Sequence, residues 1–166
     1  MTGARACWVS TPLGPVEIAE VSGRLVTIRF GEGPVAGAGP TSGVLERASE
    51  QLVAYFAGRL REFDLPLHPH GTPFDHRVWD VVRTIPYGST LTYGEIAARL
   101  EDPGASRAVG HANARNPLPI VVPCHRVVGT SGRLTGYAGG IHRKQALLEL
   151  EAASVAGQRS LPFGAP

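Results

Sequence analysis

Three short segments near the N-terminus, at residues 8–9, 16–18 and 26–30, have the pattern of strands, and apolar and polar residues alternate in the last two. A period of two is typical of half-buried strands. Turns rich in Pro, Gly and Ser separate the segments, at 12–15 and 22–23. The pattern predicts a small antiparallel sheet in which Val26, Ile28 and Phe30 share one face.

A helical period follows this sheet. Residues 31–43 are rich in Gly, Ala and Pro and are expected to form a loop. Ser42 can then cap a helix that ends at Gly58. The apolar face of this helix carries Leu45, Ala48, Leu52 and Phe56. A second alternation over 63–67 predicts an extended connector.

Helical periods dominate the second half of the chain. Thr72-Pro73 is a strong helix start, and an apolar stripe follows it at Phe74, Val78, Val82 and Ile85. Thr92-Tyr93-Gly94-Glu95 fits a capping box and opens a short helix to Leu100. After a Pro-Gly turn, residues 105–114 form a second short helix, and a last helix is expected over 143–153. The two short helices are compatible with helix-turn-helix, although many helical hairpins bind nothing.

The change of period divides the chain into three parts. Residues 1–71 are predicted to form a sheet-and-helix domain with its connector, 72–156 a mostly helical domain, and 157–166 a flexible tail. The fold class is therefore α+β. At 166 residues and 43% hydrophobic composition, the chain is long and apolar enough to bury a core.

Charge and cysteine content add little to the prediction of function. The net charge is +2, with 6 Arg against 7 acidic residues in 1–71, and 9 Arg and 1 Lys against 7 acidic residues in 72–156 and the tail. Arginine suits phosphate contacts, but from composition alone a codon bias of the genome towards Arg, Ala and Gly is the favoured explanation. Two cysteines make no disulfide framework, and no segment has the features of a membrane span or a secretory signal. A cytoplasmic protein is expected.

Cys124 has polar neighbours in the sequence that are unusual for a buried cysteine. A cysteine after Val-Val-Pro is more often a small buried hydrophobe than a nucleophile. His125 and Arg126 follow it directly, and Glu149 and Glu151 are the nearest downstream carboxylates. A thiol with a nearby base, itself oriented by a carboxylate, is the arrangement of an activated nucleophile. Metal-ligand spacings are missing, so structural zinc is not expected.

Further motifs lie before and after Cys124 in the sequence. In chain order they are Ile85-Pro86-Tyr87-Gly88, Thr92-Tyr93-Gly94-Glu95-Ile96-Ala97, Ser106-Arg107-Ala108-Val109-Gly110, Asn116-Pro117, Pro123-Cys124-His125-Arg126-Val127 and Gly136-Tyr137-Ala138-Gly139-Gly140. In order and spacing they resemble the O6-alkylguanine-DNA alkyltransferases from about Phe74 to Glu151. The resemblance implies a ribonuclease H-like N-terminal domain and a C-terminal winged helix-turn-helix domain. It also implies DNA repair by direct transfer of an alkyl group from O6 of guanine to the protein itself, after base flipping, in a single turnover.

The same resemblance implies roles for the catalytic residues. Cys124 would attack the alkyl carbon, His125 would take the thiol proton through a water, and Glu151 would hold the tautomer of His125. Asn116 would hydrogen-bond the turn that carries the cysteine, and Tyr93 would donate to the departing base. Taken singly, each partner of Cys124 has a structural explanation as well, such as packing, a solvated charge or an Asn-Pro turn.

Further residues are implied in substrate and DNA binding. Arg107 would fill the place of the flipped base in the minor groove. The other DNA-binding residues would be Thr92, Ala105, Ser106, Ala108, Gly110, His111, Ala112, Asn113 and Arg115. The substrate pocket would be formed by Tyr93, Arg126, Val127, Tyr137, Ala138 and Gly139.

The expected partner is double-stranded DNA containing O6-alkylguanine, bound by a monomer or by a cooperative assembly on DNA. Cofactors and metals are not expected, because the damaged DNA supplies the alkyl group, and Cys7 alone cannot build the zinc site of eukaryotic members. Ala138 stands where some relatives carry serine, which bears on tolerance of bulky alkyl groups. The alternative is a non-catalytic alkylated-base-binding protein of the alkyltransferase-like type, which usually carries tryptophan in place of the cysteine.

Overall fold

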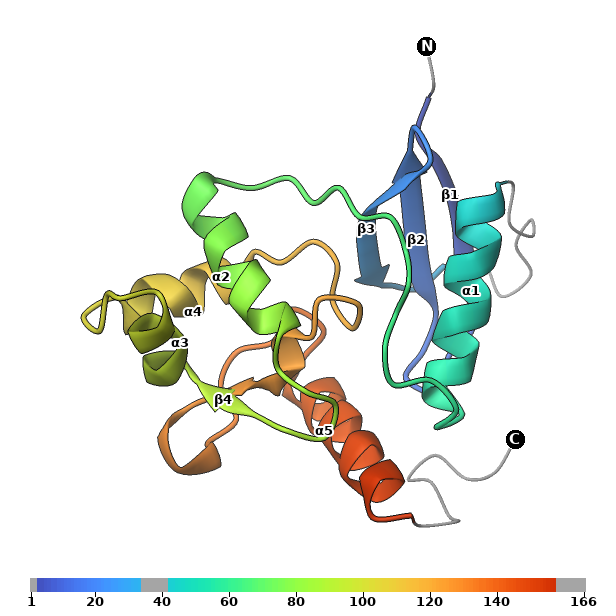
Figure 1. Cartoon of the computed structure of the whole chain (residues 1–166). Helices are drawn as coiled ribbons and strands as arrows, with labels where there is room; N and C mark the ends of the chain where they lie inside the picture. Colours follow the sequence, from blue (N-terminus) through green and yellow to red (C-terminus); the bar gives the residue numbers. More distant parts are fainter. Residues whose placement is uncertain (1–2, 34–41, 158–166) are drawn as a thin grey trace.

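The computed structural model describes residues 3–33 and 42–157, which form a sheet-and-helix part and a mostly helical part side by side (Figure 1). Strands β1 (Arg5–Val9), β2 (Val16–Val21) and β3 (Arg24–Phe30) make an antiparallel sheet in the order β1-β2-β3. Helix α1 (Gly43–Phe56) covers one face of it. The predicted small sheet followed by a helix is confirmed.

The face of β3 differs from the prediction. Leu25 and Ile28 are buried, whereas Val26 is half-buried. The register of β2 against β3 shifts between Ala19 and Glu20, so that Val26 has no partner opposite it. A bulge of this kind inserts one residue and changes which positions face the core. The alternation expected over 26–30 was therefore wrong at Val26.

Helix α1 follows its sequence signals closely. The Ser42 side chain accepts a hydrogen bond from the Leu45 amide at 3.2 Å, which caps the first turn. The expected apolar face is buried against the sheet, and Tyr55 joins it. Gly58 adopts a positive φ of 74°, a conformation that glycine tolerates, and the chain leaves the helix there. The loop expected over 31–43 lies largely outside the described residues, as does the predicted tail beyond 157.

The C-terminal part contains helices α2 (Pro73–Arg83), α3 (Tyr93–Arg99), α4 (Ser106–Ala114) and α5 (Ile141–Val155). Thr72 with Asp75, and Thr92 with Glu95, form reciprocal capping boxes at the starts of α2 and α3, as the sequence predicts. Strands β4 (Leu91–Thr92) and β5 (Val127–Val128) pair in parallel. The last helix is longer than predicted by two residues at each end. The α+β fold class is confirmed.

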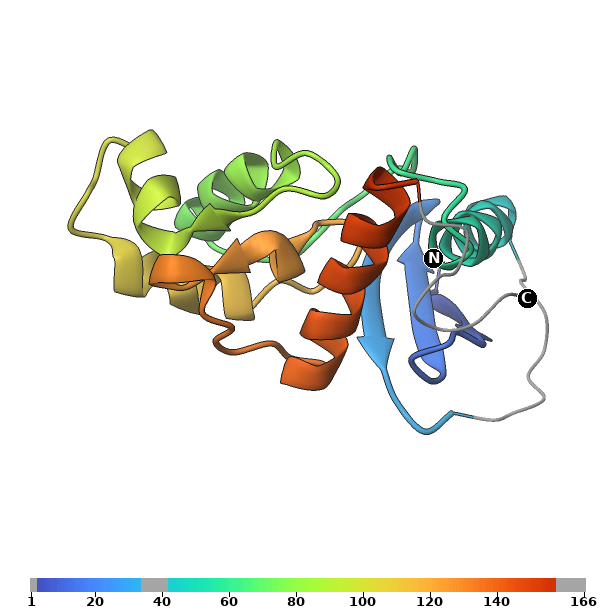
Figure 2. The same cartoon turned by 90° about the horizontal axis from the view of Figure 1, so that it is seen from below.

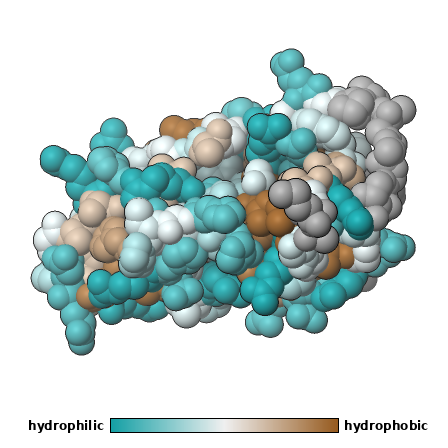
Figure 3. Space-filling model, turned by 90° about the horizontal axis from the view of Figure 1, so that it is seen from above, coloured by the Kyte–Doolittle hydropathy of each residue, from teal (hydrophilic) through white to brown (hydrophobic). Residues whose placement is uncertain are grey.

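Helix α5 lies between the helical part and the sheet (Figure 2). Several hydrogen bonds join the parts: for example, the Ile28 amide donates to the Pro117 carbonyl at 2.8 Å, and Arg143 of α5 donates to the Leu13 carbonyl at 3.0 Å. Side chains far apart in the sequence therefore meet along α5. The face seen in Figure 3 is mostly hydrophilic, with separate small apolar areas. Among the described residues, no helix is both long and apolar enough to cross a membrane.

Candidate active site and nucleic-acid interface

Cys124 begins a short 3-10 helix, η1 (Cys124–Arg126), after a turn that Asn116 closes. The Asn116 Nδ2 donates to the Val122 carbonyl at 2.9 Å, and its Oδ1 accepts from the Leu118 amide at 3.0 Å. Ile120 lies inside this turn with a φ of 75°, a costly conformation for a β-branched residue. The two hydrogen bonds hold the turn against that cost and so position the cysteine that follows.

The Cys124 side chain is 5% exposed. Burial raises the pKa of its thiol to about 11, although a hydrogen bond from Asn116 and the charge of Lys144 act in the opposite direction. The thiol is therefore neutral in the resting protein at physiological pH. A nucleophilic role requires a neighbouring group that removes its proton.

His125 is fully buried, and its Nε2 lies 2.7 Å from Oε2 of Glu151. Burial lowers the pKa of the imidazole, so that the neutral ring is favoured. A neutral ring paired with a carboxylate carries its proton on Nε2, which leaves the lone pair on Nδ1. No protein hydrogen-bond partner reaches Nδ1 within the described part of the chain. A free acceptor nitrogen therefore stands beside the cysteine in sequence.

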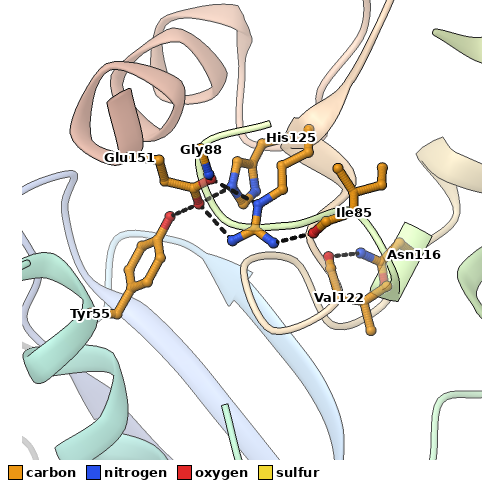
Figure 4. A network of polar contacts seen from close by, with 8 residues as sticks. Tyr55, Ile85, Gly88, Asn116, Val122, His125 and Glu151 are labelled. Atoms are coloured by element: carbon orange, nitrogen blue, oxygen red, sulfur yellow. Dashed lines mark hydrogen bonds and ion pairs between the residues drawn. The ribbon is translucent and has the colours of Figure 1, made fainter. Parts of the chain in front are cut away.

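Glu151 of α5 is the centre of a buried polar network (Figure 4). Its oxygens accept hydrogen bonds from Tyr55 at 2.6 Å, from His125 at 2.7 Å, from Arg126 at 2.8 and 3.0 Å, and from the Gly88 amide at 3.2 Å. Burial alone would raise the pKa of this carboxyl. Hydrogen bonds and charge from His125 and Arg126 outweigh burial and lower the pKa of Glu151 well below its usual range. The carboxylate is thus ionised at any physiological pH.

Arg126 occupies a different place from the one expected. Its guanidinium is bound to Glu151 and donates to the Ile85 carbonyl at 2.8 Å, and it lies 5.5 Å from the centre of the Tyr87 ring. This placement differs from the expected substrate-pocket position. It neutralises the buried charge of Glu151, which would otherwise be costly.

A loop of residues 129–140 carries Tyr137, Ala138 and Gly139, and its Thr135 contacts Tyr93 of α3. The Thr135 hydroxyl donates to the Tyr93 hydroxyl at 2.9 Å, and the Lys144 ammonium donates to the Thr135 carbonyl at 2.8 Å. Tyr137 packs edge-on against Phe30 of β3, while Val127 is buried in β5. Ala138 is exposed and Gly139 is half-buried.

Helix α4 separates its residues into two faces. Arg107, Ala108 and His111 are exposed, and Ser106 and Gly110 are half-buried beside them. A cavity of about 570 Å³ opens beside this face, and Arg107 and His111 line it together with Thr92, Tyr93, Gly94, Ser106, Gly110, Ala114, Gly129, Thr130, Thr135 and Gly136. Arg107, the expected finger, and Tyr93, which was expected in the substrate pocket, therefore line the same cavity. Ala105, which was expected at the DNA, is half-buried before the helix.

Three expected DNA-binding residues are placed otherwise. Ala112 and Asn113 are buried on the inner face of α4, and Asn113 donates to the Cys124 carbonyl at 3.2 Å. The helical period turns both residues towards the core, and this burial does not favour direct contact with DNA. Arg115 remains partly exposed but forms an ion pair with the buried Asp75 at 2.5 Å.

Sequence reasoning missed three residues of the site, namely Tyr55, Asn113 in its inward role, and Lys144. Lys144 is fully buried, and burial lowers the pKa of its ammonium to about 8. The position of Lys144 on the same helix face as Leu147 and Glu151 was the available signal, since lysine is almost never fully buried without a partner. Tyr55 carried a similar signal, because a buried phenol usually finds a hydrogen-bond partner.

Comparison with known proteins places these features in a family. A family model described as the 6-O-methylguanine DNA methyltransferase DNA binding domain matches residues 73–153. A second model, the ribonuclease-like domain of the same methyltransferases, matches residues 8–69. The chain belongs to the 6-O-methylguanine DNA methyltransferase family. The enzyme class and the ribonuclease-like N-terminal domain predicted from the motifs are confirmed.

Members of this family include close relatives along nearly the whole chain. A methylated-DNA–protein-cysteine methyltransferase of Mycobacterium tuberculosis is 51% identical over 147 residues, 86% of this chain and 89% of the relative. A protein of the same name from Methanosarcina acetivorans is 49% identical over 146 residues, with 85% and 94% covered. The crystal structure of Mycobacterium tuberculosis OGT in complex with DNA matches with a TM-score of 0.81 and 49% identity, covering 91% of this chain and 93% of that one.

The described residues contain no group of three or more His, Cys, Asp and Glu side chains close enough to hold a metal ion.

Proposed function

We propose that this protein repairs DNA by moving an alkyl group from O6 of guanine in duplex DNA onto Cys124, once per molecule. The observation that carries the proposal is the buried His125–Glu151 pair directly after Cys124 in the sequence, in which Nδ1 of His125 has no hydrogen-bond partner among the described residues. Membership of the 6-O-methylguanine DNA methyltransferase family supports the same reaction.

The transfer begins with the proton of the thiol. Nδ1 of His125 accepts this proton through a bridging water, and Glu151 stabilises the imidazolium that forms. The thiolate sulfur attacks the alkyl carbon, a carbon–sulfur bond forms, and the bond from that carbon to O6 breaks. The electron pair of the broken bond stays on the guanine, and the Tyr93 hydroxyl donates to the base as it leaves. A thioether does not leave under cellular conditions, so each molecule reacts once.

Lys144 supplies a positive charge next to this chemistry. Its charge lowers the pKa of Cys124 in the resting site, where burial acts the other way. The ammonium also lies 6.0 Å from the centre of the Tyr93 ring and hydrogen-bonds the loop that Tyr93 contacts. A cation in this position stabilises both the thiolate and the negative charge that develops on the base.

The alkylated base must leave the stack before the thiol can reach it. The outward face of α4, with Arg107 and the small Ala108, suits close approach to the minor groove, and Arg107 is long enough to fill the vacated place. Extrusion costs a few kcal/mol, which contacts to the base and the gap must offset. The complex of Mycobacterium tuberculosis OGT with DNA supports DNA as the partner.

The protein is proposed to act as a monomer that needs no cofactor, because the damaged base supplies the alkyl group and the protein supplies the acceptor. A reducing cytoplasm keeps such a thiol free.

The proposal is tested by stoichiometry. Excess duplex DNA with one radiolabelled O6-methylguanine is incubated with the protein, and label on protein and restored guanine in DNA are both counted. We expect both to stop at one per protein molecule. Binding of the lesion without transfer, as in the alkyltransferase-like alternative, or continued turnover, would contradict it.

A further inference from the structure

Tyr55 reaches the active site from the other domain. It lies on α1, in the sheet-and-helix part, and its hydroxyl donates to Oε2 of Glu151 at 2.6 Å (Figure 4). The side chain is fully buried. Aromatic contacts fix the ring, with centroids at 5.3 Å from Phe56, 5.5 Å from Phe63 and 6.2 Å from Tyr87. The hydroxyl is therefore held at the carboxylate by packing as well as by its hydrogen bond.

The oxygen that Tyr55 contacts is the same oxygen that holds the imidazole. Oε2 of Glu151 accepts from Tyr55, from Nε2 of His125 at 2.7 Å and from Nη2 of Arg126 at 3.0 Å. The other oxygen, Oε1, accepts from Nε of Arg126 and from the Gly88 amide. Donors on one oxygen share its negative charge, so each weakens the bond that the others make.

We propose that the Tyr55 hydroxyl is a positioning group for alkyl transfer, which holds Glu151 in place and, by sharing Oε2 with His125, sets how strongly the imidazole attracts the proton of Cys124. This inference rests on the function proposed above. It makes the sheet-and-helix domain part of the chemical step, beyond any role in folding.

The phenol acts as a fixed donor over the whole working pH range. Burial and the charge of Glu151 raise the pKa of Tyr55 well above its usual value, so the hydroxyl keeps its proton. Without this donor, more negative charge remains on Oε2, and the carboxylate holds the Nε2 proton of His125 more tightly. Nδ1 then becomes more basic, and the pKa of His125 rises.

Other charged or titratable groups also face the His125–Glu151 pair, and all of them stay unchanged in the Tyr55 variants below. From η1, α5, the segment after α2 and the loop before α5 these are Cys124, Arg126, Lys144, Tyr87 and Tyr137.

The test is the pH dependence of transfer from free O6-benzylguanine, which avoids any effect on DNA binding. The rate should fall on the acid side as His125 becomes protonated. For Tyr55→Phe we expect this acid limb to move to higher pH by about half a unit to one unit, with the alkaline plateau within about threefold of wild type. Tyr87→Phe is the matched control, because it removes a neighbouring hydroxyl that has no hydrogen bond to Glu151 in the described structure.

A second variant reverses the sign. Replacing Tyr55 by 3-fluorotyrosine strengthens the donor while keeping the ring, and the acid limb should then move to lower pH. The ring ¹⁵N shifts of His125 give the same titration without any reaction, and keep the test available if one variant reacts slowly.

An acid limb that stays at the wild-type pH in both variants, or a rate lowered equally at every pH, would overturn the inference and leave Tyr55 as a packing residue. Failure of the wild-type protein to alkylate Cys124 at any pH would instead overturn the proposed function itself.

Discussion

The two cysteines are buried to the same degree but have very different surroundings. Cys7 on β1 is 4% exposed and Cys124 is 5% exposed. Burial raises the pKa of both thiols. The polar neighbour of Cys7 is the Ser49 hydroxyl at 3.8 Å, which itself donates to the Leu45 carbonyl. The exposed fraction and the direction of the thiol pKa shift therefore do not separate the two residues.

The two cysteines differ in whether a neighbouring group can accept the proton of the thiol. A serine hydroxyl is far too weak a base to accept the proton of Cys7. Beside Cys124, an imidazole with a free Nδ1 is backed by the ionised Glu151, and Lys144 adds a positive charge. We therefore propose that the reactivity of Cys124 depends on neighbours that accept its proton and stabilise its charge, rather than on exposure of the sulfur.

The comparison of the two cysteines is tested most strongly by replacing each of them with alanine. Cys124→Ala should abolish alkyl transfer while duplex binding stays near wild type, because the α4 surface is untouched. Cys7→Ala, the matched control, should transfer at the wild-type rate. Single-turnover assays and gel-shift titrations check this, and equal loss of DNA binding in Cys124→Ala would count against the assigned role.

Removing the base should have the next largest effect. His125→Gln should slow transfer about 10²–10⁴-fold, the usual contribution of a positioned general base. The measurement is the single-turnover rate with free O6-benzylguanine at neutral pH. His76→Gln, an exposed histidine on α2, is the control and should change little. A loss of less than about threefold in His125→Gln would show that the thiol ionises by another route.

A substitution at Arg107 separates the access of a base in duplex DNA to the Cys124 sulfur from the reactivity of that sulfur. Arg107→Ala should slow repair in duplex DNA by about tenfold or more, because the flipped state loses contacts that offset unstacking. Reaction with free O6-benzylguanine should stay within about twofold of wild type. Arg59→Ala, an exposed arginine in the other domain, serves as control. Equal slowing of both reactions would remove the finger role.

The smallest expected effect is on stability. Folding lowers the pKa of His125, so below the ordinary histidine pKa of about 6.5 the unfolded chain binds a proton that folded His125 resists. Stability should therefore fall as the pH drops from 7 to 5, by at most about 1.4 kcal/mol per pH unit for one proton. Urea unfolding of His125→Gln should show a weaker dependence, and an unchanged slope would argue against this assignment.

Local signals let the sequence predict much of the fold. The capping pairs Thr72 with Asp75 and Thr92 with Glu95 lie three residues apart, and such bonds depend on little else. The helix faces followed from periodicity for the same reason. The nucleophile and its base were predicted because they are adjacent in the sequence and belong to an ordered set of motifs.

Contacts between distant segments could not be predicted in this way. Tyr55 and Glu151 are 96 residues apart, and only the tertiary fold brings their side chains together. The inward turn of Asn113 depends on which face of α4 meets the turn at Cys124. The bulge at Val26 arises from pairing between strands, which an alternating pattern does not record.

The most direct test locates the transferred group between the two sulfurs. The protein is incubated with a duplex containing O6-methylguanine, digested, and both cysteine peptides are weighed by mass spectrometry. The account predicts a gain of about 14 Da, one methylene, on the peptide with Cys124 and none on the peptide with Cys7, since thiolate formation decides the site. A methyl group on Cys7, or on neither cysteine while the DNA is repaired, would contradict it.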